Sequence, residues 1–132
     1  MFSLRIVTPA GIYKEIDEVK LLNFVTPDGM RGLLSNHMPL AAVLTISKMT
    51  VVEDKKRTDY AIAEGFLSFQ NNQALVIAQA VERKGDIDVA RALAQKEAAE
   101  KRLLQKESED YLRAQVSLQK ALNRLKVAGE KE

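Results

Sequence analysis

The chain contains no cysteine and no tryptophan, and it has one histidine, three prolines and six glycines among its 132 residues. Without cysteine, the sequence excludes disulfides, thiolate metal sites and a cysteine nucleophile. Because His37 is the only histidine, most acid and base chemistry that uses histidine is also excluded. A P-loop, a G-x-G-x-x-G phosphate loop and a Ser-His-Asp set are likewise missing. These absences predict a protein that is not an enzyme.

An excess of one charge and long apolar runs are also missing. The 20 basic and 18 acidic residues give a net charge of +2, which is too balanced to indicate nucleic-acid binding. No apolar run reaches the ~20 residues that span a bilayer. The N-terminal MFSLRIVTPAG has a strand pattern rather than that of a signal peptide. We therefore expect a chain that stays in the compartment where it is made. We also expect the isolated chain to be a monomer.

Residues 1–84 read as short strands separated by turn signals. The pattern alternates apolar and polar residues over FSLRIVT, and Pro9-Ala10-Gly11 and Pro27-Asp28-Gly29 mark turns. The charged run 53–57 lies between two strand-like segments and predicts a hairpin loop. The pair Asn71-Asn72 predicts another, because asparagine tolerates the positive φ of a tight turn. Isolated Gly65 predicts a β-bulge. Together these signals favour an antiparallel β-sandwich or barrel.

The period changes after Gly85, where the sequence becomes helical. Asp86 or Asp88 is a suitable N-cap for the first helix. Alanines recur every four residues on one face and predict a smooth stripe for close packing, with leucines beside it. The stripe consists of Ala90, Ala94 and Ala98, with Leu93 and Leu104.

A second helix is predicted to start at Ser108, after a polar run over residues 105–110, and to end near Gly129. Its expected apolar stripe is formed by Leu118, Ala121, Leu122 and Leu125. Because the link between the helices is short, they must form an antiparallel hairpin. The predicted organisation is thus a β-sandwich over 1–84 and a two-helix hairpin over 85–132.

The second helix has an uneven charge. From Tyr111 to Ala128 no residue is acidic, whereas four are basic: Arg113, Lys120, Arg124 and Lys126. One interpretation is a solvated face whose C-terminal cations complement the helix dipole. The other is a helix that meets an acidic partner or an anion.

Three motifs in this order carry a family resemblance. They are GLLSNHMPL over 32–40, GFLSF over 65–69 and IDVARA over 87–92, and together they resemble the ε subunit of bacterial F-type ATP synthases along nearly the whole chain. Ser35 stands where that family usually has proline. The resemblance implies a non-catalytic subunit of the rotor stalk, bound to the γ subunit and the c-ring, near the α and β subunits. It also implies a peripheral location on the cytoplasmic side of a bacterial membrane, with membrane association only through the complex.

The resemblance also assigns roles to particular residues. The c-ring contact corresponds to a loop at Asp28, Gly29, Met30 and Arg31. The γ contact corresponds to His37, Met38 and Pro39, although His37 is equally consistent with a histidine hydrogen-bonded beside a turn. The hairpin is the regulatory part of the family, in which the basic second helix meets an acidic loop of β and stops ATP hydrolysis. The implied contacts to β are Arg113, Lys120, Arg124 and Lys126.

An ATP site is implied at the start of the first helix. There a helix N-terminus offers free N–H groups, and a guanidinium one turn later can hold phosphate oxygens. The implied ATP-binding residues are Glu82, Ile87, Asp88, Arg91, Ala92, Lys120 and Arg124. ATP would act as a regulatory ligand, with Mg²⁺ held only through its phosphates. Ala98 stands where strong ATP binders of the family have another arginine.

Three alternatives stay open at this stage. Asp88 and Arg91 are also consistent with a helix cap and an ion pair, which contributes only ~0.2–0.5 kcal/mol. The chain is also consistent with a non-regulatory member of the family that binds no ATP. Finally, a β-sandwich adaptor could use the helical hairpin to bind an unrelated acidic partner.

Overall fold

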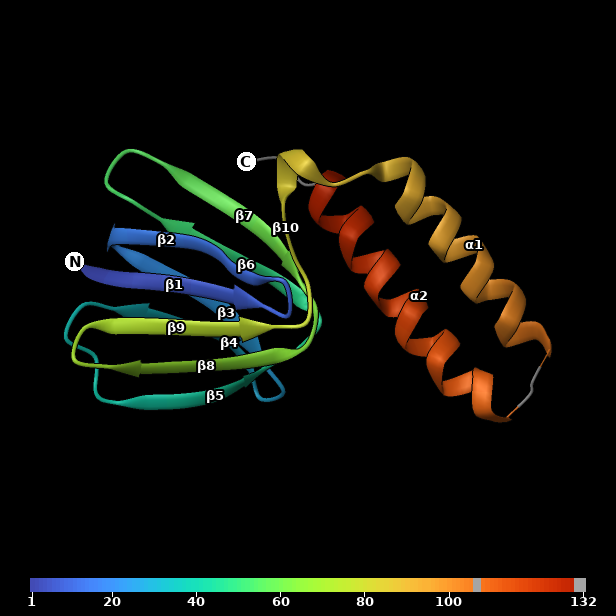
Figure 1. Cartoon of the computed structure of the whole chain (residues 1–132), viewed down its shortest axis with the longest axis horizontal. Coiled ribbons are helices and arrows are strands. Elements are labelled where there is room, and N and C mark those ends of the chain that lie inside the picture. Colours follow the sequence, from blue (N-terminus) through green and yellow to red (C-terminus); the bar gives the residue numbers. More distant parts are fainter. Residues whose placement is uncertain (106–107, 130–132) are drawn as a thin grey trace. The chain divides into compact units, whose positions relative to one another are not determined.

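The computed structural model describes residues 1–105 and 108–129 and divides the chain into two compact units, with the boundary between Arg83 and Lys84. The first unit contains strands only, and the second contains a 3₁₀ turn and two helices (Figure 1). Of the helices in these described ranges, none is long and apolar enough to cross a membrane. Each unit is described separately below.

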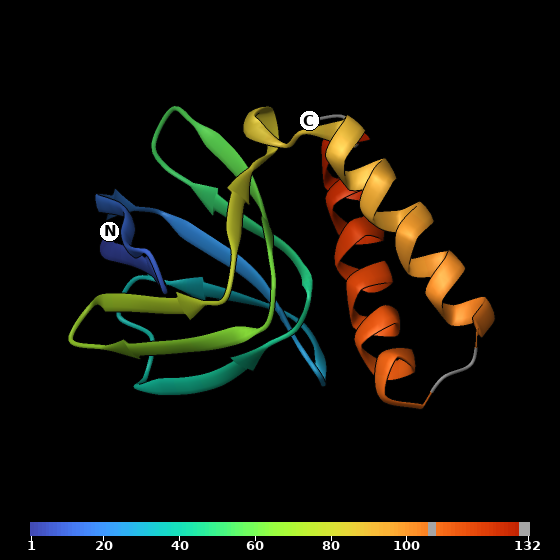
Figure 2. The same ribbon diagram turned by 45° about the vertical axis from the view of Figure 1, so that its right-hand side comes forward.

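The first unit is a sandwich of two five-stranded sheets (Figure 2). The first sheet has the order β2 (Gly11–Val19), β1 (Phe2–Thr8), β9 (Gln73–Ala78), β8 (Gly65–Gln70) and β5 (Leu40–Leu44). The second has the order β10 (Val81–Arg83), β7 (Arg57–Ile62), β6 (Ser47–Val52), β3 (Leu21–Thr26) and β4 (Gly29–Leu34). All neighbours pair antiparallel except β1 and β9, which are parallel. The predicted β-sandwich is confirmed.

The sandwich core follows the alternation in the sequence. Leu4 and Ile6 of β1 are buried, as are Leu22 and Phe24 of β3, whereas Arg5 between the first two is exposed. All four apolar residues belong to one cluster that draws on both sheets. Because each fully buried side chain of this kind contributes about 1.5–3 kcal/mol, the cluster is the main stabilising feature of the unit.

The predicted hairpin turns are confirmed, and two of them share one design. The motif T-P-x-G occurs at 8–11 and at 26–29. In the second copy, the Thr26 hydroxyl accepts a hydrogen bond from the Asp28 N–H and donates one to the Gly29 carbonyl, at 3.2 and 3.1 Å. Gly29 has a φ of 125°, which disfavours any residue with a Cβ. Asn71 and Asn72, with φ of 51° and 56°, form the turn between β8 and β9.

Gly65 does not form the predicted bulge. It pairs in regular register with Leu44 on one side and Ala78 on the other. A Cβ added at this position would lie 2.1 Å from the Ile77 carbonyl oxygen. Glycine is therefore required because two backbones approach closely, which is the other common reason for a glycine within a strand.

One carboxylate is buried on the second sheet. Asp59 on β7 is 2% exposed and accepts a hydrogen bond from the Thr50 hydroxyl on β6, at 2.8 Å. The two residues pair directly across the strands. Arg57 Nε lies 3.6 Å from the same carboxylate oxygen. This polar contact satisfies a group that would otherwise be costly to bury.

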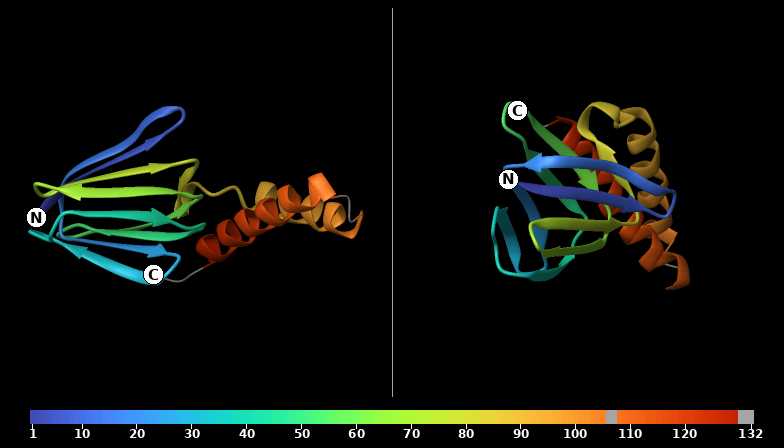
Figure 3. Two further views of the ribbon diagram at one scale, coloured as in Figure 1. Left: turned by 90° about the horizontal axis from the view of Figure 1, so that it is seen from below. Right: turned by 60° about the vertical axis from the view of Figure 1, so that its left-hand side comes forward.

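The second unit begins with the 3₁₀ turn η1 (Lys84–Asp86), followed by α1 (Val89–Gln105) and α2 (Ser108–Gly129). The helices form an antiparallel hairpin, as predicted (Figure 3). The predicted polar break between them includes residues 106 and 107, which lie outside the described residues. Helix α2 begins at Ser108, the residue predicted to start it.

The predicted packing stripe of α1 is wrong. Ala90, Ala94 and Ala98 are exposed, and so are Leu93 and Leu104. The alanines that are buried instead lie seven residues apart on each helix. They are Ala92 and Ala99 on α1 and Ala114 and Ala121 on α2. Seven residues are close to two helical turns, so each pair lies on one face and allows the helices to pack closely.

The stripe predicted for α2 is right in part. Ala121 is buried, Leu118 and Leu125 are half-buried, and Leu122 is 45% exposed. Val127, which the pattern missed, is fully buried. Alanines occur on several faces of α1, so their spacing alone does not select the packing face of that helix.

We predict that Gly65→Ala lowers the free energy of unfolding by roughly 1–3 kcal/mol, because the new methyl group overlaps the Ile77 backbone rather than a flexible side chain. Urea denaturation of the full chain measures this change. Gly129→Ala is the matched control, since a Cβ there has no atom within 4 Å. Equal stability of the two variants would contradict the close approach.

Candidate functional site

The start of α1 is built as the sequence predicted. The Asp88 carboxylate accepts a hydrogen bond from the Arg91 N–H at 3.1 Å, and its carbonyl accepts from the Ala92 N–H at 3.0 Å. Asp88 is thus the N-cap, and Asp86 belongs to the preceding 3₁₀ turn. The Asp88 and Arg91 side chains, both within the described part of the chain, form no ion pair. The Arg91 side chain is exposed beside this helix start.

Arg124 of α2 is fixed against α1 by a residue that the sequence analysis missed. Its Nη1 donates to Gln95 Oε1 at 3.2 Å, and Gln95 Nε2 donates to the Ser117 hydroxyl at 3.3 Å. Gln95 lies one turn beyond Arg91, so the cation of α2 lies across from the first turns of α1. The only signal in the sequence was that Gln95 is the one uncharged polar residue between Ala92 and Ala99.

The remaining residues of the implied ATP site are distributed as follows. Ile87 and Ala92 are buried and contribute to packing. Lys120 is half-buried on α2, one turn before Arg124. Glu82 lies on β10 of the first unit, half-buried and paired with Ala61 of β7. The hairpin therefore contains the helix cap, Arg91 and Arg124 in one unit, whereas Glu82 belongs to the other.

The four cations of α2 differ in exposure. Arg113 and Lys126 are exposed, whereas Lys120 and Arg124 are half-buried. A shallow groove of about 430 Å³ lies beside them, lined by Arg113 and Lys120 together with Gln95, Leu112, Val116 and Ser117. Leu112 is 67% exposed. This surface combines apolar and cationic groups, which suits an amphipathic acidic segment.

The residues implied to contact the c-ring occupy a turn and an edge strand. Asp28 lies in the turn between β3 and β4, whereas Gly29, Met30 and Arg31 are the first residues of β4. The expected loop is therefore mostly strand, because β4 pairs with β3 from Gly29 to Leu34. Met30 is 77% exposed, although it lies in a strand.

The His37–Pro39 segment links β4 to β5. His37 Nδ1 lies 2.7 Å from the Met38 carbonyl oxygen, and its ring meets the edge of the Phe69 ring with centroids 6.2 Å apart. His37 is therefore hydrogen-bonded beside a turn and is also exposed. Met38 is 78% exposed. Both of the roles considered for His37 are compatible with this geometry.

An exposed apolar row crosses the outer face of the first sheet, and the sequence analysis did not find it. Val43 of β5 pairs with Phe66 of β8, which pairs with Ile77 of β9, which in turn pairs with Val7 of β1. Phe66 is 62% exposed, Val43 51% and Ile77 48%. The sequence pattern does not show this row, because its members come from four separate strands. Exposed apolar patches of this kind mark interaction surfaces.

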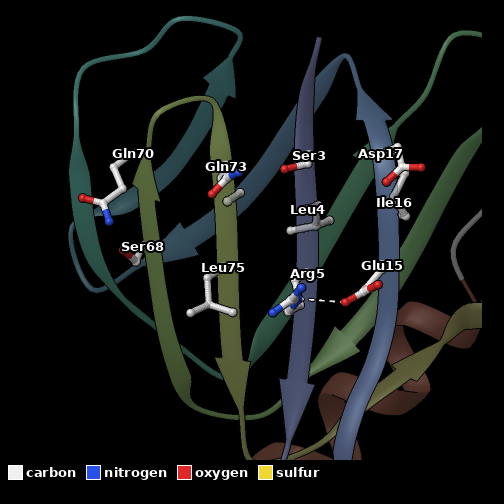
Figure 4. Close-up of a pocket in the computed structure, with 11 residues that line it drawn as sticks. Ser3, Leu4, Arg5, Glu15, Ile16, Asp17, Ser68, Gln70, Gln73 and Leu75 are labelled. Carbon is white, nitrogen blue, oxygen red and sulfur yellow. Dashed lines mark ion pairs between the residues drawn. The ribbon is translucent and has the colours of Figure 1, made fainter.

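The same sheet has a polar recess of about 350 Å³ over β2, β1, β9 and β8 (Figure 4). Arg5 and Glu15 form an ion pair at 2.8 Å in it, and both side chains are about half exposed. None of the residues predicted from the sequence lies here. No group of three or more His, Asp or Glu side chains among the described residues could hold a metal ion.

Comparison with protein families divides the chain within two residues of the boundary in the structure. Residues 1–84 match the β-sandwich domain of the ATP synthase delta/epsilon chain, and residues 86–129 match its long α-helix domain. The chain belongs to the ATP synthase delta/epsilon family.

Individual relatives agree with this family over nearly their whole length. The ATP synthase epsilon chain of Caldicellulosiruptor bescii is 40% identical over 130 residues, which cover 98% of this chain and 94% of that one. The epsilon chain of Halalkalibacterium halodurans is 40% identical over 128 residues, 96% of each chain. A chain in the mitochondrial ATP synthase structure of Euglena gracilis has the same fold, with a TM-score of 0.82 and 17% identity over 96% of this chain and 80% of that one.

We predict that Asp88→Ala weakens the first turn of α1 by about 1 kcal/mol, because the Arg91 N–H loses its acceptor. Hydrogen exchange of the Arg91 amide measures the change and should become about fivefold faster. Asp88→Asn is the control, since asparagine caps as well as aspartate. Slow exchange in the alanine variant would show that the cap contributes little.

Proposed function

We propose that this chain is the rotor-stalk subunit of a proton-translocating F-type ATP synthase. In this role it joins the c-ring to γ, catalyses no reaction itself, and inhibits ATP hydrolysis by the α and β subunits through its hairpin in an ATP-sensitive way. Its place is peripheral, on the cytoplasmic side of a bacterial membrane, held there through the complex. The observation that carries this proposal is the near full-length similarity to two ATP synthase epsilon chains, each about as long as this one.

The surface of the sandwich supports the structural part of the proposal. A rotor subunit must bind its partners through a rigid body if torque is to be transmitted. The apolar row Val43, Phe66 and Ile77 stands on the first sheet. Exposed Met30 lies on edge strand β4 of the second sheet, and exposed Met38 lies in the segment between β4 and β5. We assign the apolar row and Met38 to γ, and Met30 with Arg31 to the c-ring. Apolar centres with few charges are typical of protein interfaces.

The second helix supports the inhibitory part. Arg113 and Lys126 are exposed on a helix without acidic residues from Tyr111 to Ala128, and an apolar groove lies beside Arg113. An acidic segment of β would gain both apolar burial and charge complementarity there. An isolated solvated face would not need the exposed Leu112 and Val116 beside Arg113 and Lys120.

We predict that replacing Arg113 and Lys126 together by alanine raises ATP hydrolysis severalfold in a complex reconstituted from α, β, γ and this chain, because charge pairs at interfaces each contribute about 1.5 kcal/mol or more. Steady-state ATPase rates measure the effect. The control removes two exposed cations from α1, Lys101 and Arg102. Equal release of inhibition by both double variants would contradict a specific role for α2.

The ATP-sensitive part rests on the hairpin. The α1 N-terminus offers N–H groups, Arg91 is exposed beside it, and Arg124 is held across from it by Gln95. Cations from both helices meet a ligand only while the helices are packed together. ATP, with Mg²⁺ on its phosphates, would therefore stabilise the packed hairpin by its differential affinity. A 100-fold preference would shift the equilibrium by ~2.7 kcal/mol.

We predict that ATP binds the isolated full-length chain and that Arg91→Ala weakens this binding at least tenfold, because a charged hydrogen bond to phosphate contributes about 1.5–3 kcal/mol. Isothermal titration calorimetry measures both affinities. Arg102→Ala removes a cation of the same helix away from its start and should bind as the unchanged chain does. No binding at millimolar ATP would favour the non-regulatory member of the family.

A further inference from the structure

A pair of asparagines joins two loops that are far apart in the sequence. The Asn36 N–H donates to Asn72 Oδ1 at 2.7 Å, and Asn72 Nδ2 donates back to Asn36 Oδ1 at 3.0 Å. Asn36 lies at the start of the segment that precedes β5, and Asn72 lies in the turn between β8 and β9. The two residues therefore form a reciprocal clamp between these loops.

The clamp is anchored at its Asn72 end. The Asn72 carbonyl accepts a hydrogen bond from the Ser3 N–H at 3.1 Å, which ties this turn to β1. The residue is half-buried, whereas its neighbour Asn71 is exposed. The turn is thus part of the rigid sheet, and Asn36 is attached to it.

The segment beyond Asn36 needs such an anchor. Asn36 has a φ of 63°, an unfavourable conformation for most residues, and His37 and Met38 after it are exposed. Beyond the clamp, the contacts that hold the His37 ring and backbone are the short bond to the Met38 carbonyl, a 3.3 Å bond from its N–H to the Leu34 carbonyl, and the edge of Phe69. Without the clamp, a segment with so few contacts would lose conformational entropy on binding, and this loss would weaken the binding.

We propose that Asn72 is a positioning residue that holds the Asn36–Met38 segment in its docking conformation for the γ subunit. This inference rests on the proposed function, in which Met38 contacts γ. Asn72 acts through Asn36: it keeps the positive φ at that residue and so sets the direction in which His37 and Met38 project. Its own side chain makes no contact with γ.

The test compares two glycine variants of the same turn in the full chain. Asn72→Gly removes both clamp bonds, whereas Asn71→Gly removes the neighbouring side chain. Both positions have positive φ, so glycine fits each backbone equally well. Affinity for a complex of α, β and γ that lacks this chain is measured by biolayer interferometry. NMR order parameters of residues 36–38 are measured in the free protein.

We expect Asn72→Gly to weaken binding about tenfold and to lower the order parameters of residues 36–38, because the segment must then be ordered on binding. Asn71→Gly should change the affinity by no more than about twofold and should leave the order parameters of residues 36–38 unchanged. Asn72→Asp keeps the acceptor for the Asn36 N–H and should retain affinity within about threefold. Met38→Asp, which places a charge in the docking surface, should weaken binding strongly.

Two results would overturn the inference. If Met38→Asp weakens binding but the two glycine variants behave alike, the segment docks without needing the clamp. If Met38→Asp has no effect, the segment does not contact γ, and its proposed docking role fails together with the inference drawn from it.

Discussion

The parallel pairing of β1 with β9 is the contact on which the rest of the first unit depends. It joins Ser3 to Gln73 and Val7 to Ile77, residues from the two ends of the strand sequence. Contacts so distant in sequence must overcome a large loop-closure entropy, which the buried apolar core offsets. This pairing extends the outer apolar row to β1, and the Ser3 bond to the Asn72 carbonyl anchors the turn that holds Asn36. The extension of the apolar row to β1 and the anchoring of Asn36 thus both depend on this one strand pairing.

In the second unit the corresponding constraint is the close packing of two helices. Alanines seven residues apart on each helix leave little side-chain volume between the backbones. Within this narrow interface, Gln95 joins Ser117 and Arg124 by hydrogen bonds, so the polar contact fixes which cation faces α1. Close packing and cation placement are therefore coupled, because separation of the helices would break the Gln95 bonds. A ligand that contacts both helices would sense that separation.

The two units differ in stiffness, and the proposed docking and regulatory roles differ in the stiffness that they require. The first sheet pairs in regular register from β1 through β9 and β8 to β5, and this stiffness suits a body that transmits force and presents apolar contacts. A hairpin of two amphipathic helices depends on packing between the helices for its stability. The acid-free run of α2 adds long-range attraction to acidic surfaces. The proposed rigid docking and the proposed switchable contact thus belong to different residues of one chain.

The sequence by itself determined the local structure: the turns at Pro9-Ala10-Gly11 and Asn71-Asn72, an aspartate cap of α1 at Asp86 or Asp88, the start of α2, and the order of sandwich and hairpin. These follow from backbone preferences and hydrogen bonds within a few residues, which a linear pattern records. Only the tertiary structure decided which alanines pack, why Gly65 is required, and that Val43, Phe66 and Ile77 form one row. Each of these depends on which strands or helix faces become neighbours. Which strands and helix faces become neighbours depends on the total apolar surface buried across the fold. That total cannot be read from a short stretch of sequence.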